Sequence, residues 1–174
     1  MANDVIVTNN EVTFQFDELI VSKTDLKGHL IYANDVFLNI AGFVESEVLG
    51  QPHSLLRHPD MPRCIFKLLW SELESGNEIF AYVKNRTKNG DHYWVNAHVT
   101  PSMDASGQVI GYHSTRRLPE RRVIDNVIIP LYKDLRAEEE RHSNRKEGME
   151  ASLGMVRGIL QDRGLDYDKF VQTL

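Results

Sequence analysis

The stretch VKNRTKNGDHYWV, residues 83–95, decides the fold of this chain. Asn89-Gly90 stands near its centre, and this dipeptide is among the strongest signals for a tight turn between antiparallel strands. Apolar and polar residues alternate on both sides of the turn, as they do in strands with one buried face. We therefore predict a strand over residues 78–88 and a second strand over residues 92–100, joined as a hairpin.

Further strand-like regions flank this hairpin. Downstream, a looser turn at residues 104–107 leads into a strand-like run over residues 108–117. Upstream, residues 19–34 read as two short strands around a turn in which Gly28 can adopt a positive φ. We therefore expect another hairpin there, and five strands in all.

Helical spacing of apolar residues occupies the segment between the two hairpins. A short helix is expected after Asn34, with Gly42 near its end, and a helical turn at residues 46–50. A longer helix is expected from Pro62 to just before Gly76, because proline suits the first turn of a helix. Two strands, several short helices and three strands predict an α+β fold, in which a five-stranded antiparallel sheet carries the helices on one face.

The composition changes near residue 119, where a helical extension begins. Pro130 is expected to bend its first helix, and Gly164 to end a later one. We predict an N-terminal cap over residues 1–18, a core domain over residues 19–118 and a C-terminal helical extension over residues 119–174. A helix with one apolar stripe needs a surface to cover, which the core domain, a second copy of the chain or a partner helix could each supply.

Composition excludes several classes of protein. The 174 residues include 20 Lys and Arg against 25 Asp and Glu, a formal net charge of −5, which argues against a nucleic-acid-binding protein. The chain has no long uninterrupted apolar run, so we expect no direct membrane insertion. Its first residues lack the form of a signal peptide, and its one cysteine, Cys64, excludes an internal disulfide. These features predict a cytoplasmic protein.

No set of residues suggests catalysis. The sequence contains no nucleophile elbow, phosphate loop or kinase signature, so we expect a protein that is not an enzyme. Seven histidines raise the question of a metal, but none of them forms a recognised metal-binding spacing with cysteines or carboxylates. We predict no metal site, and haem held by one axial histidine stays open as an alternative.

Asn85 is the polar side chain most suggestive of a ligand. Strict alternation places it on the same strand face as Ile79, Ala81 and Val83, so its amide would point into the core. A buried amide needs partners, and a carboxamide can both donate to and accept from a polar ring system with amide-like edges. The alternative is that Asn85 only begins the turn before Asn89.

Asn34 and the aromatic pair Phe66 and Trp70 each have two interpretations. Asn34 follows a strand and precedes a helix, so it is either a ligand-binding residue or the helix N-cap. Phe66 and Trp70 lie one helical turn apart and share a face. Their rings could stack along a planar ligand, although such a pair is more often part of an ordinary core.

A proline-bounded segment contributes Arg57, His58 and Asp60. Prolines restrict the backbone there, which would hold the three side chains in place. Arg57 suits a diphosphate, and His58 could bind a cofactor or orient Asp60. The alternative is a surface loop with a local Arg–Asp ion pair.

Two longer runs carry a family resemblance. GQPHSLLRHPDMP (residues 50–62) and the stretch over residues 83–95 resemble the flavin-binding PAS domains of aerotaxis receptors. DLKG (residues 25–28) and YAN (residues 32–34) agree with the same fold, and the resemblance covers about residues 19–135. The C-terminal residues resemble those of stand-alone PAS energy-taxis proteins, which work beside a separate membrane chemoreceptor.

The resemblance implies a PAS sensor domain that holds FAD non-covalently between the sheet and the short helices. The redox state of the flavin would alter the domain surface, and the signalling region of a membrane chemoreceptor would read the change. The protein would then lie in the cytoplasm, peripheral to the inner membrane through that receptor, with a homodimer left open. The residues that the resemblance assigns to FAD are Asn34, Arg57, His58, Asp60, Phe66, Trp70 and Asn85. A haem-binding PAS sensor and a cofactor-free PAS interaction module are the alternatives.

The chain departs at two places from the family that it resembles. Ile79 stands where aerotaxis PAS domains often have a tryptophan, which implies weaker flavin retention or a different cofactor. Light-sensing PAS relatives form a flavin–cysteine adduct, but His53 holds the place of that cysteine here. We therefore expect no adduct photochemistry, and we predict that Cys64, a helix later, is a small buried residue.

Overall fold

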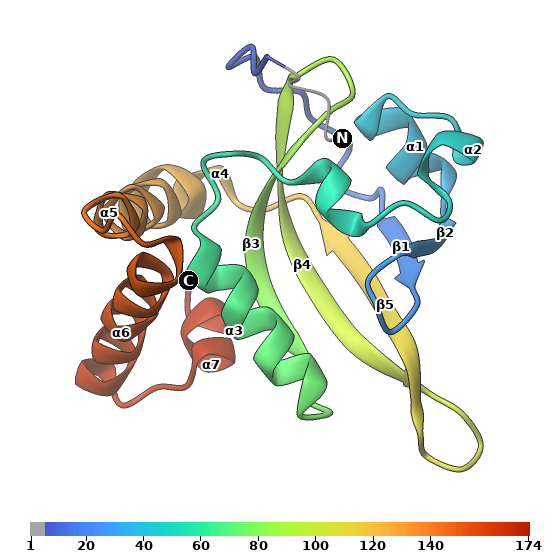
Figure 1. The fold of residues 1–174 in the computed structure, drawn as a ribbon. Coiled ribbons are helices and arrows are strands. Elements are labelled where there is room, and N and C mark those ends of the chain that lie inside the picture. The colour runs from blue at the N-terminus through green and yellow to red at the C-terminus, as the bar shows by residue number, and fades with distance from the viewer. Residues whose placement is uncertain (1–5) are drawn as a thin grey trace.

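The computed structural model describes residues 6–174; residues 1–5, the beginning of the predicted N-terminal cap, lie outside it. One antiparallel sheet forms the centre of the molecule (Figure 1). Its strands are β1 (Ile20–Thr24), β2 (Leu30–Ala33), β3 (Ile79–Arg86), β4 (His92–Met103) and β5 (Val109–Arg117). Their order across the sheet is β2-β1-β5-β4-β3, which places the two predicted hairpins on either side of β5. The predicted α+β fold with five antiparallel strands is confirmed.

The β3–β4 hairpin follows the alternation in the sequence. Asn85 pairs with Tyr93 and Val83 pairs with Val95, so the apolar faces of the two strands coincide. Gly90 has a φ of 93° in the turn, a conformation that glycine adopts without strain. Strand β4 continues to Met103, three residues beyond the predicted end, because its residues 96–103 pair with β5 after the pairing with β3 ends at Val99.

Along the chain, the short helices follow the first hairpin and precede the second, as predicted. They are α1 (Asp35–Ala41), α2 (Glu45–Val48), a 3₁₀ turn η1 (His53–Leu56) and α3 (Arg63–Glu74). Gly42 ends α1 in the left-handed conformation, and Pro62 immediately precedes α3. Figure 1 shows α3 lying across β3 and β4. Cys64, in the first turn of α3, is fully buried, which confirms the prediction made for it.

The C-terminal extension is entirely helical. It contains α4 (Arg121–Val123), a π-helical turn η2 (Ile124–Ile128), α5 (Ile129–Glu140), α6 (Arg145–Arg163) and α7 (Tyr167–Gln172). The π turn ends two residues before Pro130, which lies in the first turn of α5 and has no N–H for the usual helical hydrogen bond. Gly164 ends α6 as predicted. None of the helices within residues 6–174 combines the length and apolar character needed to span a bilayer.

The extension packs on its own core domain. This is one of the three surfaces that its apolar stripe was expected to cover, beside a second copy of the chain and a partner helix. Helix α6 contacts α3, and α7 lies against β3, an edge strand of the sheet (Figure 1). The Phe80 N–H donates to the Asp168 carboxylate at 2.9 Å, and the Tyr132 hydroxyl donates to the Tyr82 carbonyl at 2.6 Å. The extension therefore supplies hydrogen-bond partners that β3 lacks on its outer side.

Candidate functional site

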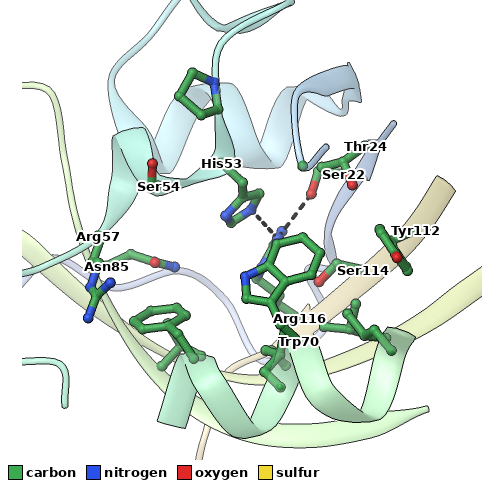
Figure 2. A pocket seen from close by; sticks show the side chains of 18 of the residues that line it. Ser22, Thr24, His53, Ser54, Arg57, Trp70, Asn85, Tyr112, Ser114 and Arg116 are labelled. Atoms are coloured by element: carbon green, nitrogen blue, oxygen red, sulfur yellow. Dashed lines mark hydrogen bonds between the residues drawn. The ribbon is translucent and has the colours of Figure 1, made fainter. Parts of the chain in front are cut away.

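A cavity of about 340 Å³ lies between the sheet, η1 and α3. Ligand-binding pockets usually measure about 300–1,000 Å³, so this one is large enough for one planar ring system. Its walls are mainly apolar, with polar groups at separate points (Figure 2). The lining residues used below are Ser22, Gly28, His53, Arg57, Phe66, Trp70, Val83, Asn85, Tyr112, Ser114 and Arg116.

Two of the predicted polar residues meet at one side of the cavity. Asn85 is 3% exposed and lies on the cavity side of β3, as alternation predicted. Arg57 forms a backbone bridge with Asn85, which brings the proline-bounded segment to the sheet. The Arg57 guanidinium lies 4.3 Å from the centre of the Phe66 ring, within range of a cation–π contact. Partial burial lowers the pKa of Arg57, but an arginine stays charged at neutral pH.

The aromatic pair on α3 also lines the cavity. Trp70 meets the Tyr112 ring edge-on, with 5.4 Å between the ring centres. A Cβ atom at Gly28 would lie 3.1 Å from the Trp70 ring, so glycine permits the indole to approach the β1–β2 turn. Together with Phe66, Trp70 gives α3 an aromatic face toward the cavity (Figure 2).

Asn34 does not line the cavity and acts as a structural residue. Its side-chain oxygen accepts from the Phe37 N–H at 3.1 Å, which caps α1, and from the Val21 N–H at 3.0 Å. Its NH₂ group donates to the Leu19 carbonyl at 2.8 Å. The side chain is therefore committed to joining β1 to α1, the role that sequence left open beside ligand binding.

His58 and Asp60 also lie outside the cavity lining. The fully buried His58 accepts the Asp60 N–H at Nδ1, 3.1 Å away. The Asp60 carboxylate receives Lys84 Nζ at 2.6 Å, next to Asn85 on β3. Burial, with a smaller contribution from Lys84, lowers the pKa of His58 to about 4. The Asp60–Lys84 ion pair thus links the loop to β3 outside the cavity lining.

Arg116, which was not predicted from the sequence, is the most deeply placed charge in the cavity. Arg116 is 4% exposed, and its Nη2 donates to His53 Nε2 at 2.5 Å and to Ser22 Oγ at 3.0 Å (Figure 2). Burial lowers its pKa to about 10, so it remains a cation at neutral pH. Burial and the neighbouring Arg116 lower the pKa of His53 to about 3, which leaves that imidazole neutral. The alternation of Tyr112, Ser114 and Arg116 along β5 was the available signal.

Some polar groups in this region have no partner. Among residues 6–174, no protein atom accepts a hydrogen bond from Arg116 Nη1, and none pairs with the buried Ser114 Oγ. Most buried polar groups in proteins are paired, so two orphans on one cavity wall suit a polar occupant. Within the same residues no three His, Cys, Asp or Glu side chains are grouped closely enough to hold a metal.

Comparison with known proteins agrees with this architecture. The family profile described as PAS fold matches residues 30–116, half of the chain. The aerotaxis receptor of Escherichia coli K12 is 40% identical over 138 residues, which cover 79% of this chain and 27% of the receptor. The nitrogen fixation regulatory protein of Klebsiella oxytoca is 28% identical over 97 residues, 56% of this chain and 20% of that protein. The chain thus spans only a small part of these relatives.

Solved structures show the same fold. A light-oxygen-voltage domain studied with a flavin analogue aligns with a TM-score of 0.55 and 22% identity, over 71% of this chain and 87% of that one. A PAS domain from Colwellia psychrerythraea aligns with a TM-score of 0.54 and 22% identity, over 60% of this chain and 88% of that one. From the profile match, the architecture and the identity to the aerotaxis receptor, the chain belongs to the PAS family.

Proposed function

We propose that this chain is a redox sensor that binds FAD non-covalently in the cavity and signals to a separate membrane chemoreceptor. The observation that carries the proposal is the cavity itself, with its polar and aromatic lining, in a PAS domain 40% identical to an aerotaxis receptor. The protein would act in the cytoplasm, at the inner membrane only through its receptor. We retain the division into cap, sensor domain (residues 19–118) and extension as part of this proposal.

The residues present suit the isoalloxazine ring. The Asn85 amide can donate and accept at the ring edge, and Phe66 and Trp70 offer flat apolar surfaces to its faces. The cavity volume accommodates the ring but not a whole dinucleotide, so the diphosphate would extend toward solvent. Arg57 is only partly buried and could meet it there. His58 and Asp60 would support these contacts from behind, through Lys84 and β3.

The replacement of tryptophan by Ile79 leaves the proposed ring site intact. Ile79 is 1% exposed and does not belong to the cavity lining. The aromatic cover comes instead from Phe66 and Trp70 on α3. We therefore expect FAD to be retained despite this departure from the related sequences.

The test is a visible spectrum of the purified chain, followed by extraction and chromatographic identification of any flavin. We expect a yellow protein that releases FAD in equimolar amount. Asn85→Ser should weaken FAD binding at least tenfold, about 1.4 kcal/mol, because a buried hydrogen-bond partner is lost. Asn39→Ser, on an exposed position of α1, is the matched control and should bind as the parent does. A colourless protein that takes up no added FAD would contradict the proposal.

Haem is the second cofactor that the spectrum would reveal, through a Soret band. His53 faces the cavity, but its Nε2 accepts a hydrogen bond from Arg116 and is therefore engaged. An axial ligand would require that bond to break, so the geometry favours flavin over haem. A cofactor-free interaction module would leave the orphaned groups of the cavity without partners.

Signalling to a receptor has its own test. The FAD-loaded chain, oxidised or reduced, should differ in affinity for the cytoplasmic signalling region of a methyl-accepting chemoreceptor. A two-state sensor requires such a difference, because a ligand state shifts an equilibrium only through differential interaction. Equal affinities would contradict this part of the proposal. Light scattering on the same samples would establish whether the chain forms a homodimer.

A further inference from the structure

Arg116 is a buried cation without an anionic partner. It is 4% exposed, and none of the ion pairs among residues 6–174 includes it. Its two hydrogen-bond acceptors, Ser22 and His53, are both uncharged. Its guanidinium also lies 5.8 Å from the Phe37 ring centre, a weaker neutral contact. The surroundings therefore orient the charge without neutralising it.

Such an arrangement is costly in an isolated domain. Taking a charge out of water without a counter-charge costs several kcal/mol, and native proteins seldom tolerate it without a reason. Nη1 has no partner, and the neighbouring Ser114 hydroxyl on β5 has none either. Because both residues line the cavity, the missing negative partner is expected from a ligand.

The position of Arg116 indicates which part of the ligand carries the charge. Figure 2 shows Arg116 beneath His53, between Asn85 on one side of the cavity and Tyr112 on the other. The second cavity arginine, Arg57, lies beside Asn85 and is more exposed. Phosphates favour solvent, so the partly exposed Arg57 suits them, whereas the enclosed Arg116 suits a ring.

We propose that Arg116, held by His53 and Ser22, stabilises negative charge on the reduced flavin ring and so raises its reduction potential. This inference rests on the proposed function. Reduction of the oxidised ring by two electrons, with uptake of one proton from solvent, leaves one negative charge on the ring. A fixed guanidinium favours that charged product over the neutral oxidised ring, and charge near the ring is a known means of tuning flavins. Arg116 thus sets how readily the sensor is reduced.

The experiment compares Arg116→Gln with Arg117→Gln in the FAD-loaded full chain. Arg117 is the matched control, since it is the next residue of β5, has the same charge and is exposed. Each protein is titrated with dithionite, and the midpoint potential is read from the flavin spectrum. We expect Arg116→Gln to weaken the binding of reduced FAD at least tenfold more than the binding of oxidised FAD. The midpoint potential would then fall by about 30 mV for a two-electron couple. Arg117→Gln should leave the potential unchanged.

Riboflavin, which has the ring but no phosphate, separates the two anionic parts of FAD. The same fall in potential with riboflavin would support charge on the ring as the partner of Arg116. Loss of FAD affinity in Arg116→Gln, with riboflavin affinity and potential unchanged, would place a phosphate there and overturn the inference. Bound FAD with an unaltered potential would overturn the inference alone, whereas a parent chain that takes up no flavin would overturn the proposed function with it.

A stability measurement tests whether Arg116 has a purely structural role. Arg116→Met in the FAD-free chain removes a buried charge and keeps most of the side-chain volume. We expect its melting temperature to stay the same or rise, because replacing an uncompensated buried charge by an apolar residue relieves a desolvation penalty. A marked fall in melting temperature would show that Arg116 serves the fold and would count against the inference.

Discussion

The buried carboxylate of Glu139 on α5 accepts a hydrogen bond from the Cys64 N–H in the first turn of α3, with 3.1 Å between Oε1 and N. The same carboxylate receives Arg63 Nε at 2.9 Å and the Ser152 hydroxyl of α6 at 3.1 Å. One side chain thus joins three helices and satisfies an N-terminal N–H of α3. Since the other side of α3 lines the cavity, Glu139 links the extension directly to a helix of the cavity wall.

Glu139→Ala should destabilise the chain by about 3 kcal/mol, because it removes one partner of a buried ion pair and leaves Arg63 uncompensated. The adjacent Glu140→Ala is the control, since Glu140 forms an exposed pair with Arg136 and should change stability by less than about 1 kcal/mol. Urea unfolding of both variants measures the difference. Equal effects would show that the carboxylate does not hold the three helices together.

Gly148→Ala should also destabilise the chain, by about 2 kcal/mol, because a Cβ atom at this buried position of α6 would clash with the Glu139 carbonyl. Gly154 lies in the same helix, but a Cβ atom there meets open space. Gly154→Ala should therefore stabilise the helix by about 1 kcal/mol. Thermal unfolding of the two variants should give shifts of opposite sign, and shifts of the same sign would contradict the close approach of α5 and α6.

Stability should fall when the pH is lowered from about 6.5 to about 4. Burial holds the pKa of His58 at about 4, below the ordinary value of 6.5, so the unfolded chain takes up a proton before the folded chain does. The group would contribute roughly 2–3 kcal/mol to that fall. In His58→Asn, whose amide oxygen can still accept the Asp60 N–H, the dependence should be shallower. Identical pH profiles of unfolding free energy would argue against this account.

Asn34→Ala should lower the free energy of unfolding by about 2 kcal/mol, since it removes a helix cap and a link to β1. FAD affinity of the folded molecules should not change, because the side chain lies outside the cavity lining. Asn39→Ala, on an exposed position of the same helix, should cause no loss of stability. Weakened FAD binding by a fully folded Asn34→Ala protein would instead indicate that Asn34 contacts the cofactor.

The elements with local signals were predictable from the sequence. The Asn89-Gly90 turn, the proline before α3 and the glycine after α1 each determine backbone geometry within a few residues, and each element formed where expected. The helix-cap role of Asn34 was also one of the two interpretations that its position allowed. Such short-range effects do not depend on the rest of the fold.

The site was less predictable, because it depends on which strands become neighbours. Arg116 reaches Ser22 only through the pairing of β5 with β1, between segments about ninety residues apart. It reaches His53 only because η1 folds against the same part of the sheet. The sequence also did not show which residues of the proline-bounded loop would face the cavity. Arg57 lines the cavity whereas His58 does not, and no pattern within the loop distinguishes them.

The coverage of β3 by the C-terminal helices has a practical consequence. Asp168 and Tyr132 occupy backbone groups that would otherwise invite a strand from a neighbouring molecule. A chain shortened after residue 118 would present that row unprotected, and lateral stacking of molecules into insoluble aggregates should follow. We therefore expect the full chain to stay soluble at concentrations at which a chain ending at residue 118 aggregates.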